Sequence, residues 1–277
     1  MSATLLIVFR EMLEAGLIVG IVLAATQGVP RRGLWIAYGI AGGVAGACVV
    51  AVFAGAIAGL FEGSGQELFN AAVLTLAVGM LTWHNVWMAS HGREIAAEMK
   101  AVGSDVATGK RTLAALAIVV GVAVLREGAE VVLFLYGIAA SADSSLASMM
   151  LGGAIGIAGG AVVSALLYFG LLAIPTHRLF AATSTLITLL AAGLAAQAIQ
   201  YIQKAGFLRF FTQRLWNSNW LLDERGALGQ VLHTLIGYTA RPSGAQLIVY
   251  LTTIVVIVGL MRFTKQPKSQ VAPAAAD

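Results

Sequence analysis

Two short motifs place arginine and glutamate inside long apolar stretches of the chain. The segment "REMLE" at 10–14 lies within "LLIVFREMLEAGLIVGIVLAA" at 5–25, and "REGAE" at 126–130 lies within "VAVLREGAEVVLFLYGIAA" at 122–140. In each motif the two glutamates are three residues apart and share a helix face, and the arginine can approach the second glutamate four residues on. Carboxylate oxygens suit hard cations, so the motifs are candidate cation ligands.

The charges of the two motifs do not balance. Four glutamates stand against two arginines, which leaves two excess negative charges: Glu11, Glu14, Glu127 and Glu130 against Arg10 and Arg126. Each charge inside a membrane costs roughly 2.5–3.5 kcal/mol on the lenient insertion scale. Ion pairs that only join helices would balance, whereas excess carboxylate persists if the groups protonate, if water reaches them or if a cation binds. We interpret the glutamates as a cation site and the arginines as supporting groups.

The composition indicates a membrane protein. Of 277 residues, 59% are hydrophobic and only 11% are charged, and the mean hydropathy is +0.87. Apolar residues run together for 20 or more positions, the length that a helix needs to span hydrocarbon. The single cysteine, Cys48, excludes an internal disulfide and a multi-cysteine metal site. The net charge of +4 comes mostly from residues between apolar stretches, so it does not indicate nucleic-acid binding.

The predicted fold is all-α, with seven transmembrane helices in one permease domain over 1–277. The predicted spans are roughly 4–26, 33–61, 67–90, 112–140, 147–173, 179–204 and 245–262. A long connection at 205–244 carries Trp216 and Trp220, so we expect an amphipathic loop that lies at the membrane interface. The tail at 263–277 is predicted to be disordered.

The chain contains an internal repeat. An offset of 116 aligns "REMLE" with "REGAE", and an offset of 117 aligns "GIAGG" at 39–43 with "GIAGG" at 156–160. We predict two units of three helices, 1–100 and 110–204, followed by the seventh span. Because each unit has an odd number of spans, the second enters the membrane from the opposite side. In inverted-repeat transporters the site lies near the midplane between the repeats, where the two motifs would meet.

Basic residues predict the orientation. With the N-terminus outside and the C-terminus in the cytoplasm, the cytoplasmic side receives ten of them, and the two short outer loops receive none. The ten are Arg31, Arg32, Arg93, Lys100, Lys110, Arg111, Arg178, Arg262, Lys265 and Lys268. The four arginines of 205–244 oppose this assignment, but an interfacial loop lets them reach lipid headgroups.

Two smaller groups of residues are candidates for the ends of a pathway. Glu62, Glu67 and Asp143 lie in predicted outer loops without basic residues and are candidates for an entrance, although loop acids are more often only solvated. On the third span, His84 and His91 are seven residues apart and near one helix face, and with Met88 they are a candidate exit. The alternative is that His91 only marks the interface.

The two motifs resemble those of the high-affinity iron permeases of fungi, the Ftr family, and of their bacterial relatives of the EfeU type. Two further segments, "WHNVWMASHGREIAAEMK" at 83–100 and "LWNSNWLLDERGALGQVLHTLIGYTARPS" at 215–243, are similar to the bacterial members. The resemblance implies iron uptake across the cytoplasmic (inner) membrane, with the four motif glutamates as iron ligands and Arg10 and Arg126 as the matching arginines. It also implies a ferroxidase or iron-delivery protein outside the membrane as partner, beside membrane lipid.

Iron is expected as the transported substrate, as Fe³⁺ or as Fe²⁺, and no cofactor is expected. Two alternatives stay open at this point. Carboxylates also bind other metals, so a transporter of Pb²⁺ or Mn²⁺ is one. The other is an intramembrane acid–base enzyme, which would need different roles for its carboxylates, whereas the two motifs are near duplicates.

Overall fold

The chain forms a bundle of long helices. The structure is a computed structural model that describes residues 2–59, 66–140, 145–170, 176–223 and 226–264. Over these residues the helices are α1 (Ser2–Ala25), α2 (Arg32–Gly59), α3 (Gln66–Ala107), α4 (Ala114–Ala140), α5 (Leu146–Tyr168), α6 (Thr176–Lys204), α7 (Ala227–Ile236) and α8 (Gly244–Thr264). The predicted all-helical fold is confirmed.

Within the described part of the chain, five helices are long and apolar enough to cross a membrane, judged by length and composition. The five stretches are Arg32–Ala56, Glu67–Gly92, Leu146–Tyr168, Arg178–Lys204 and Gly244–Thr264. Helices α1 and α4 have matching lengths of 24 and 27 residues, but each carries three charged residues of an arginine–glutamate motif. The chain is therefore a polytopic membrane protein. The two long helices outside this set of five, α1 and α4, are the ones that carry the arginine–glutamate motifs.

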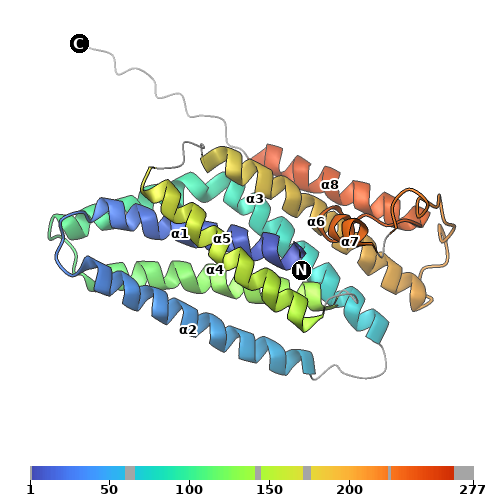
Figure 1. Ribbon diagram of the computed structural model, residues 1–277, viewed down its shortest axis with the longest axis horizontal. Helices are drawn as coiled ribbons and strands as arrows, with labels where there is room; N and C mark the ends of the chain where they lie inside the picture. The colour runs from blue at the N-terminus through green and yellow to red at the C-terminus, as the bar shows by residue number, and fades with distance from the viewer. Residues whose placement is uncertain (1, 60–65, 141–144, 171–175, 224–225, 265–277) are drawn as a thin grey trace, which may run out of the picture.

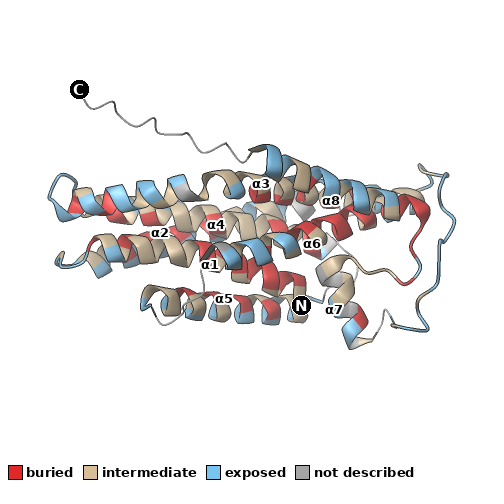
Figure 2. Ribbon diagram, turned by 90° about the horizontal axis from the view of Figure 1, so that it is seen from above, coloured by how far each residue is buried: buried red, intermediate tan, exposed pale blue. Residues whose placement is uncertain are grey.

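The helices pack lengthwise in pairs. Helix α1 lies along α5, α2 along α4 and α3 along α6, while α8 covers α6 (Figure 1). Buried residues face the middle of the bundle and exposed ones the outside (Figure 2). Large apolar side chains such as Val52 and Phe53 on α2 are exposed, which suits a surface in contact with lipid.

Two glycines bring neighbouring helices into close contact. A Cβ added at Gly43 on α2 would lie 2.7 Å from the carbonyl oxygen of Gly121 on α4. A Cβ added at Gly156 on α5 would lie 2.9 Å from the carbonyl oxygen of Leu5 on α1. Small residues at such contacts let helix backbones approach closely, which is how helices associate in lipid. Both contacts involve a helix that carries a charged motif.

Helix α3 extends beyond its predicted span of 67–90. It runs for 42 residues to Ala107, so most of the stretch between the predicted spans 67–90 and 112–140 is helical. At 1.5 Å per residue its length is about 63 Å, roughly twice the thickness of the hydrocarbon core. The connection to α4 is held by an ion pair of 3.4 Å between Arg111 Nε and Asp105 Oδ2.

The segment between α6 and α8 folds back along α6. Its helix α7 ends at Gly237, which has a left-handed φ of 69° and packs against Gly193, where an added Cβ would lie 2.6 Å from the Cα of Gly237. Gly193 precedes Lys204 at the end of α6 by 11 residues. The segment therefore reaches roughly 16 Å back along the helix axis. The hydroxyl of Tyr250 on α8 donates to the Ile236 carbonyl at 2.7 Å, which joins α7 to α8.

Aromatic side chains of this segment point outward. Trp216 and Trp220 are exposed, as the predicted interfacial loop requires, and so are three phenylalanines, Phe207, Phe210 and Phe211. Helix α8 ends at Thr264, so residues 263 and 264 of the predicted disordered tail are helical, and 265–277 lie outside the described residues.

Candidate metal centre

The motif on α1 is buried in the bundle. Arg10 and Glu14 are each 3% exposed and Glu11 is fully buried. Arg10 Nε lies 2.9 Å from Glu14 Oε1, and Arg10 Nη1 lies 3.6 Å from Glu11 Oε1. The predicted i,i+4 contact between the arginine and the second glutamate is present. The arginine thus restrains the side chains of both glutamates on its helix.

The motif on α4 repeats this arrangement with more exposure. Arg126 Nε lies 3.1 Å from Glu130 Oε1 and 3.9 Å from Glu127 Oε1. The Arg126 side chain is 35% exposed and that of Glu130 is 18% exposed. The indole of Trp87 on α3 covers the guanidinium, with its ring centroid 4.0 Å from Arg126 Cζ. The α4 motif therefore forms the open side of the site.

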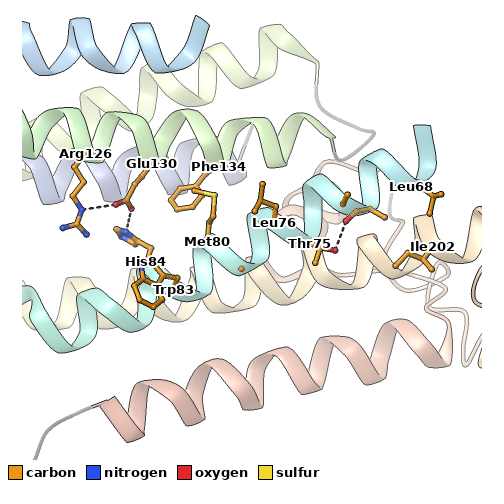
Figure 3. Close-up of a pocket in the computed structure, with 13 residues that line it drawn as sticks. Leu68, Thr75, Leu76, Met80, Trp83, His84, Arg126, Glu130, Phe134 and Ile202 are labelled. Atoms are coloured by element: carbon orange, nitrogen blue, oxygen red, sulfur yellow. Dashed lines mark hydrogen bonds and ion pairs between the residues drawn. The ribbon is translucent and has the colours of Figure 1, made fainter. Parts of the chain in front are cut away.

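His84 on α3 joins the two motifs. It is 3% exposed, and its Nδ1 faces the Glu130 carboxylate, as Figure 3 shows. Its other ring nitrogen, Nε2, lies 3.7 Å from Glu11 Oε2 and 3.8 Å from Glu14 Oε2. The imidazole therefore contacts carboxylates from both motifs.

The four motif glutamates, Glu11, Glu14, Glu127 and Glu130, are called the glutamate cluster below. One ligand atom from each of Glu11, His84, Glu127 and Glu130 lies within 4.8 Å of the others. Both carboxylate oxygens of Glu11 and of Glu14 are buried, and Arg10 is the ion-pair partner of both side chains, so one positive charge on α1 faces two carboxylates. Buried anionic oxygens of this kind favour a bound cation. Carboxylate and imidazole are donors that iron accepts, so these residues could bind an iron ion as substrate.

Helix α3 is fixed in the rotation that directs His84 inward. The adjacent Asn85 is 1% exposed and its amide donates to the Ser184 carbonyl at 3.2 Å and to Thr188 Oγ1 at 3.0 Å, both on α6. On the other side the ring of Phe134 meets the imidazole edge-on, with centroids 6.1 Å apart. These contacts hold the ring in place without occupying its nitrogens.

A cavity of about 930 Å³ leads to the site from the far end of α3. It lies between α3, α4 and α6, and its residues extend from Leu68 to His84, Arg126 and Glu130 (Figure 3). The polar groups in its wall are the side chains of Thr75, His84, Arg126 and Glu130 and the indole nitrogen of Trp83. The rest of the wall is apolar. The cavity thus reaches the α4 motif, and none of its lining residues belongs to the α1 motif.

The other residues proposed from the sequence lie apart from this centre. Glu67 is exposed in the first turn of α3, while Glu62 and Asp143 lie outside the described residues. His91 stacks on Trp87 at a centroid distance of 5.1 Å, and its Nδ1 lies 2.8 Å from Ser90 Oγ. Met88 is half-buried.

Sequence reasoning named His84 but grouped it with Met88 and His91 as an exit. The structure places it among the glutamates, and two helical turns separate it from His91. A signal was present, because an ionisable residue inside an apolar span is by default a functional candidate. The sequence did not show that α3 faces both motif helices.

Comparison with known proteins gives consistent matches over the whole chain. The model of the iron permease FTR1 family matches residues 1–264. Ferrous iron permease EfeU of Escherichia coli O6:H1 (strain CFT073) is 33% identical over 276 residues, which cover 97% of each chain. Proteins of the same name are 32% identical in Shigella sonnei, over 97% of both chains, and 30% identical in Yersinia pestis, over 100% of this chain and 98% of the relative. No solved structure gives a significant match.

Proposed function

The chain belongs to the iron permease FTR1 family and transports iron, and from that premise we propose that iron crosses the membrane through the glutamate cluster. Membership in a transporter family removes the support for an intramembrane acid–base enzyme. The family description likewise names iron and neither lead nor manganese. The relatives are named ferrous iron permeases, so we propose Fe²⁺ as the transported ion, with Fe³⁺ as the alternative to test.

The observation that carries this proposal is the meeting of two distant motifs at one buried point. Glu11 on α1 and Glu127 on α4 lie 116 residues apart in the chain, yet they share a group of ligand atoms within 4.8 Å. The cluster brings four carboxylates together with two arginines, which leaves an excess of negative charge for a cation to neutralise.

The arginines tune the cluster by partial neutralisation. Arg10 and Arg126 each contact both glutamates of their own motif, which orients the carboxylates. They also halve the formal negative charge of the site. A transport site has to release its ion, and a weaker net attraction makes release faster.

We also propose that the two halves are inverted repeats. Gly43 on α2 lies against Gly121 on α4, and Gly156 on α5 lies against Leu5 on α1. Exchanging the first helix of each half (α1 and α4), and likewise the second (α2 and α5), converts one contact into the other.

The proposed transmembrane arrangement counts α1 and α4 as spans, which gives seven with the N-terminus outside. Their length and their position inside the bundle support this count, since charged residues in a membrane protein face the bundle interior. A site built between the two halves suits alternating access to the two sides of the membrane. In this arrangement a ferroxidase or iron-delivery protein would act at the outer face, and the protein would reside in the inner membrane.

The testing experiment is uptake of radioactive iron by proteoliposomes that contain only this protein, with Fe²⁺ and Fe³⁺ supplied separately. We expect Glu14→Gln and Glu130→Gln to lower uptake at least about a hundredfold, since each removes a charged ligand from a buried site. Glu67→Gln is the matched control, because Glu67 is exposed in the first turn of α3, and it should retain most of the uptake.

Normal uptake by well-folded Glu14→Gln and Glu130→Gln proteins would exclude the glutamate cluster as the pathway. Uptake of Fe³⁺ alone by the unsubstituted protein would contradict the assignment of Fe²⁺.

A further inference from the structure

His84 gives the site a nitrogen donor that the two motifs do not contain. We propose that His84 binds the transported ion directly and makes the site select divalent first-row transition metals over Mg²⁺ and Ca²⁺. This inference rests on the proposed function. It assigns to one residue the selectivity of the site for iron over the common divalent cations Mg²⁺ and Ca²⁺.

The position of the ring fits coordination. Ligand atoms about 2.1 Å from one metal ion lie roughly 3.0 Å apart at right angles and roughly 4.2 Å apart on opposite sides. His84 Nε2 lies 3.7 Å and 3.8 Å from Glu11 Oε2 and Glu14 Oε2, which is inside this interval. One ion could therefore be bound by the imidazole and by oxygens of α1 with small side-chain shifts.

The surroundings of His84 differ from those of a structural histidine. A buried structural imidazole usually bonds a backbone carbonyl or a hydroxyl, as His233 Nδ1 does with the Tyr238 carbonyl at 2.6 Å. Both nitrogens of His84 instead face carboxylates of the glutamate cluster, Nδ1 that of Glu130 and Nε2 those of Glu11 and Glu14. The ring is 3% exposed and aimed into the site.

The expected selectivity follows from donor chemistry. Carboxylate sites accept Mg²⁺, Ca²⁺ and Mn²⁺, whereas imidazole favours iron and the later first-row metals. Fe²⁺ and Mg²⁺ carry the same charge, so carboxylates alone discriminate between them weakly. The imidazole of His84 adds the preference for Fe²⁺ over Mg²⁺. The Asn85 contact with α6 and the Phe134 contact with the ring keep its nitrogen directed at the site, so an oxygen ligand does not take its place.

The direct test is the iron K-edge X-ray absorption spectrum of the purified full-length protein in lipid nanodiscs, loaded without oxygen with one equivalent of Fe²⁺. We expect outer-shell scattering from an imidazole ring in the unsubstituted protein and in the control His91→Gln. His91 is on the same helix but belongs to the Trp87 stack. His84→Gln should lose this scattering while it still binds iron through the cluster.

The second measurement is competition between Fe²⁺ and Mg²⁺ for the same samples. In His84→Gln and His84→Asp the ratio of Mg²⁺ to Fe²⁺ dissociation constants should fall about tenfold or more, because Fe²⁺ binding weakens and Mg²⁺ binding does not. His91→Gln should leave the ratio unchanged. The aspartate variant keeps a metal-binding side chain, so a changed ratio there reflects the donor atom and not an empty space.

Two outcomes would overturn the inference: an unsubstituted protein whose iron spectrum lacks imidazole scattering, or an unchanged dissociation-constant ratio in both His84 variants. The first needs no variant to fold. Failure of the proposed function gives a different result, in which Glu14→Gln and Glu130→Gln bind iron with the unsubstituted spectrum.

Discussion

At the residue scale, the two motifs are alike in sequence and different in surroundings. Arg10 is enclosed, whereas Arg126 lines the cavity and is covered by an indole from α3. The α1 motif thus holds its glutamates in a fixed place, and the α4 motif presents Glu130 where an ion arriving through the cavity would first meet a carboxylate. Sequence alone gives the two motifs identical roles.

The contact between Trp87 and Arg126 leads to a prediction. A cation–π contact of this kind contributes about 0.5–2 kcal/mol, and here it restrains the arginine that orients Glu130. We expect Trp87→Leu to raise the KM for iron uptake about three- to tenfold while the protein stays folded, and Trp87→Phe to have a smaller effect. Trp220→Leu, at an exposed tryptophan far along the chain, is the control. An unchanged KM in Trp87→Leu would mean that the indole does not position Arg126.

At the element scale, glycine contacts set the register between paired helices. The contacts relate Gly43 to Gly156, residues 113 apart, whereas the two "GIAGG" segments align at 117. The difference is about one helical turn. The sequence alignment of the two "GIAGG" segments therefore identifies the equivalent helices, α2 and α5. The packing determines which glycine of each segment contacts the neighbouring helix at the equivalent position.

This close packing is testable by adding side chains. Gly43→Leu and Gly156→Leu would place carbon against backbone atoms at 2.7–2.9 Å, so the helices must separate. We expect each to destabilise the fold by roughly 1–3 kcal/mol, measured as a lower thermal-unfolding temperature in detergent. Gly42→Leu is the matched control, because a Cβ there meets nothing within 4 Å. Equal unfolding temperatures for Gly42→Leu and Gly43→Leu would refute the contact.

Much of the fold and part of the site could be predicted from the sequence. Hydrophobic length located the long helices, and the three-residue spacing located Glu11 with Glu14 and Glu127 with Glu130, because both signals are local. The position of His84 could not be predicted, since it depends on the rotation of α3, which Asn85 sets through contacts with residues 99 and 103 positions away. The return of Gly237 to Gly193 is a long-range contact of the same kind.

At the scale of the whole molecule, the bundle has two ends with different character. The α3–α4 connection exposes Thr108 and Lys110 at one end, and the segment after α6 exposes Trp216 and Trp220 at the other. Basic residues at the first end agree with the proposed orientation, in which the C-terminus lies in the cytoplasm. Arg209, Arg214 and Arg241 at the second end oppose it, and an interfacial position of this segment lets them reach lipid headgroups.

Orientation can be measured with single cysteines. Cys48 is the only cysteine, so Cys48→Ala supplies a background into which Thr108→Cys or Trp220→Cys is placed. In intact cells with a permeable outer layer, a membrane-impermeant thiol reagent should label Trp220→Cys and should reach Thr108→Cys only after the membrane is opened. The reverse labelling pattern would place the N-terminus in the cytoplasm.

The continuity of α3 has a mechanical consequence. His84 lies 23 residues before Ala107 on one unbroken helix, about 35 Å along its axis. A rigid-body tilt of this helix by roughly 5° about the site would displace its far end by about 3 Å. An ion that drew His84 toward the glutamate cluster would therefore also move the α3–α4 connection at that end of the bundle.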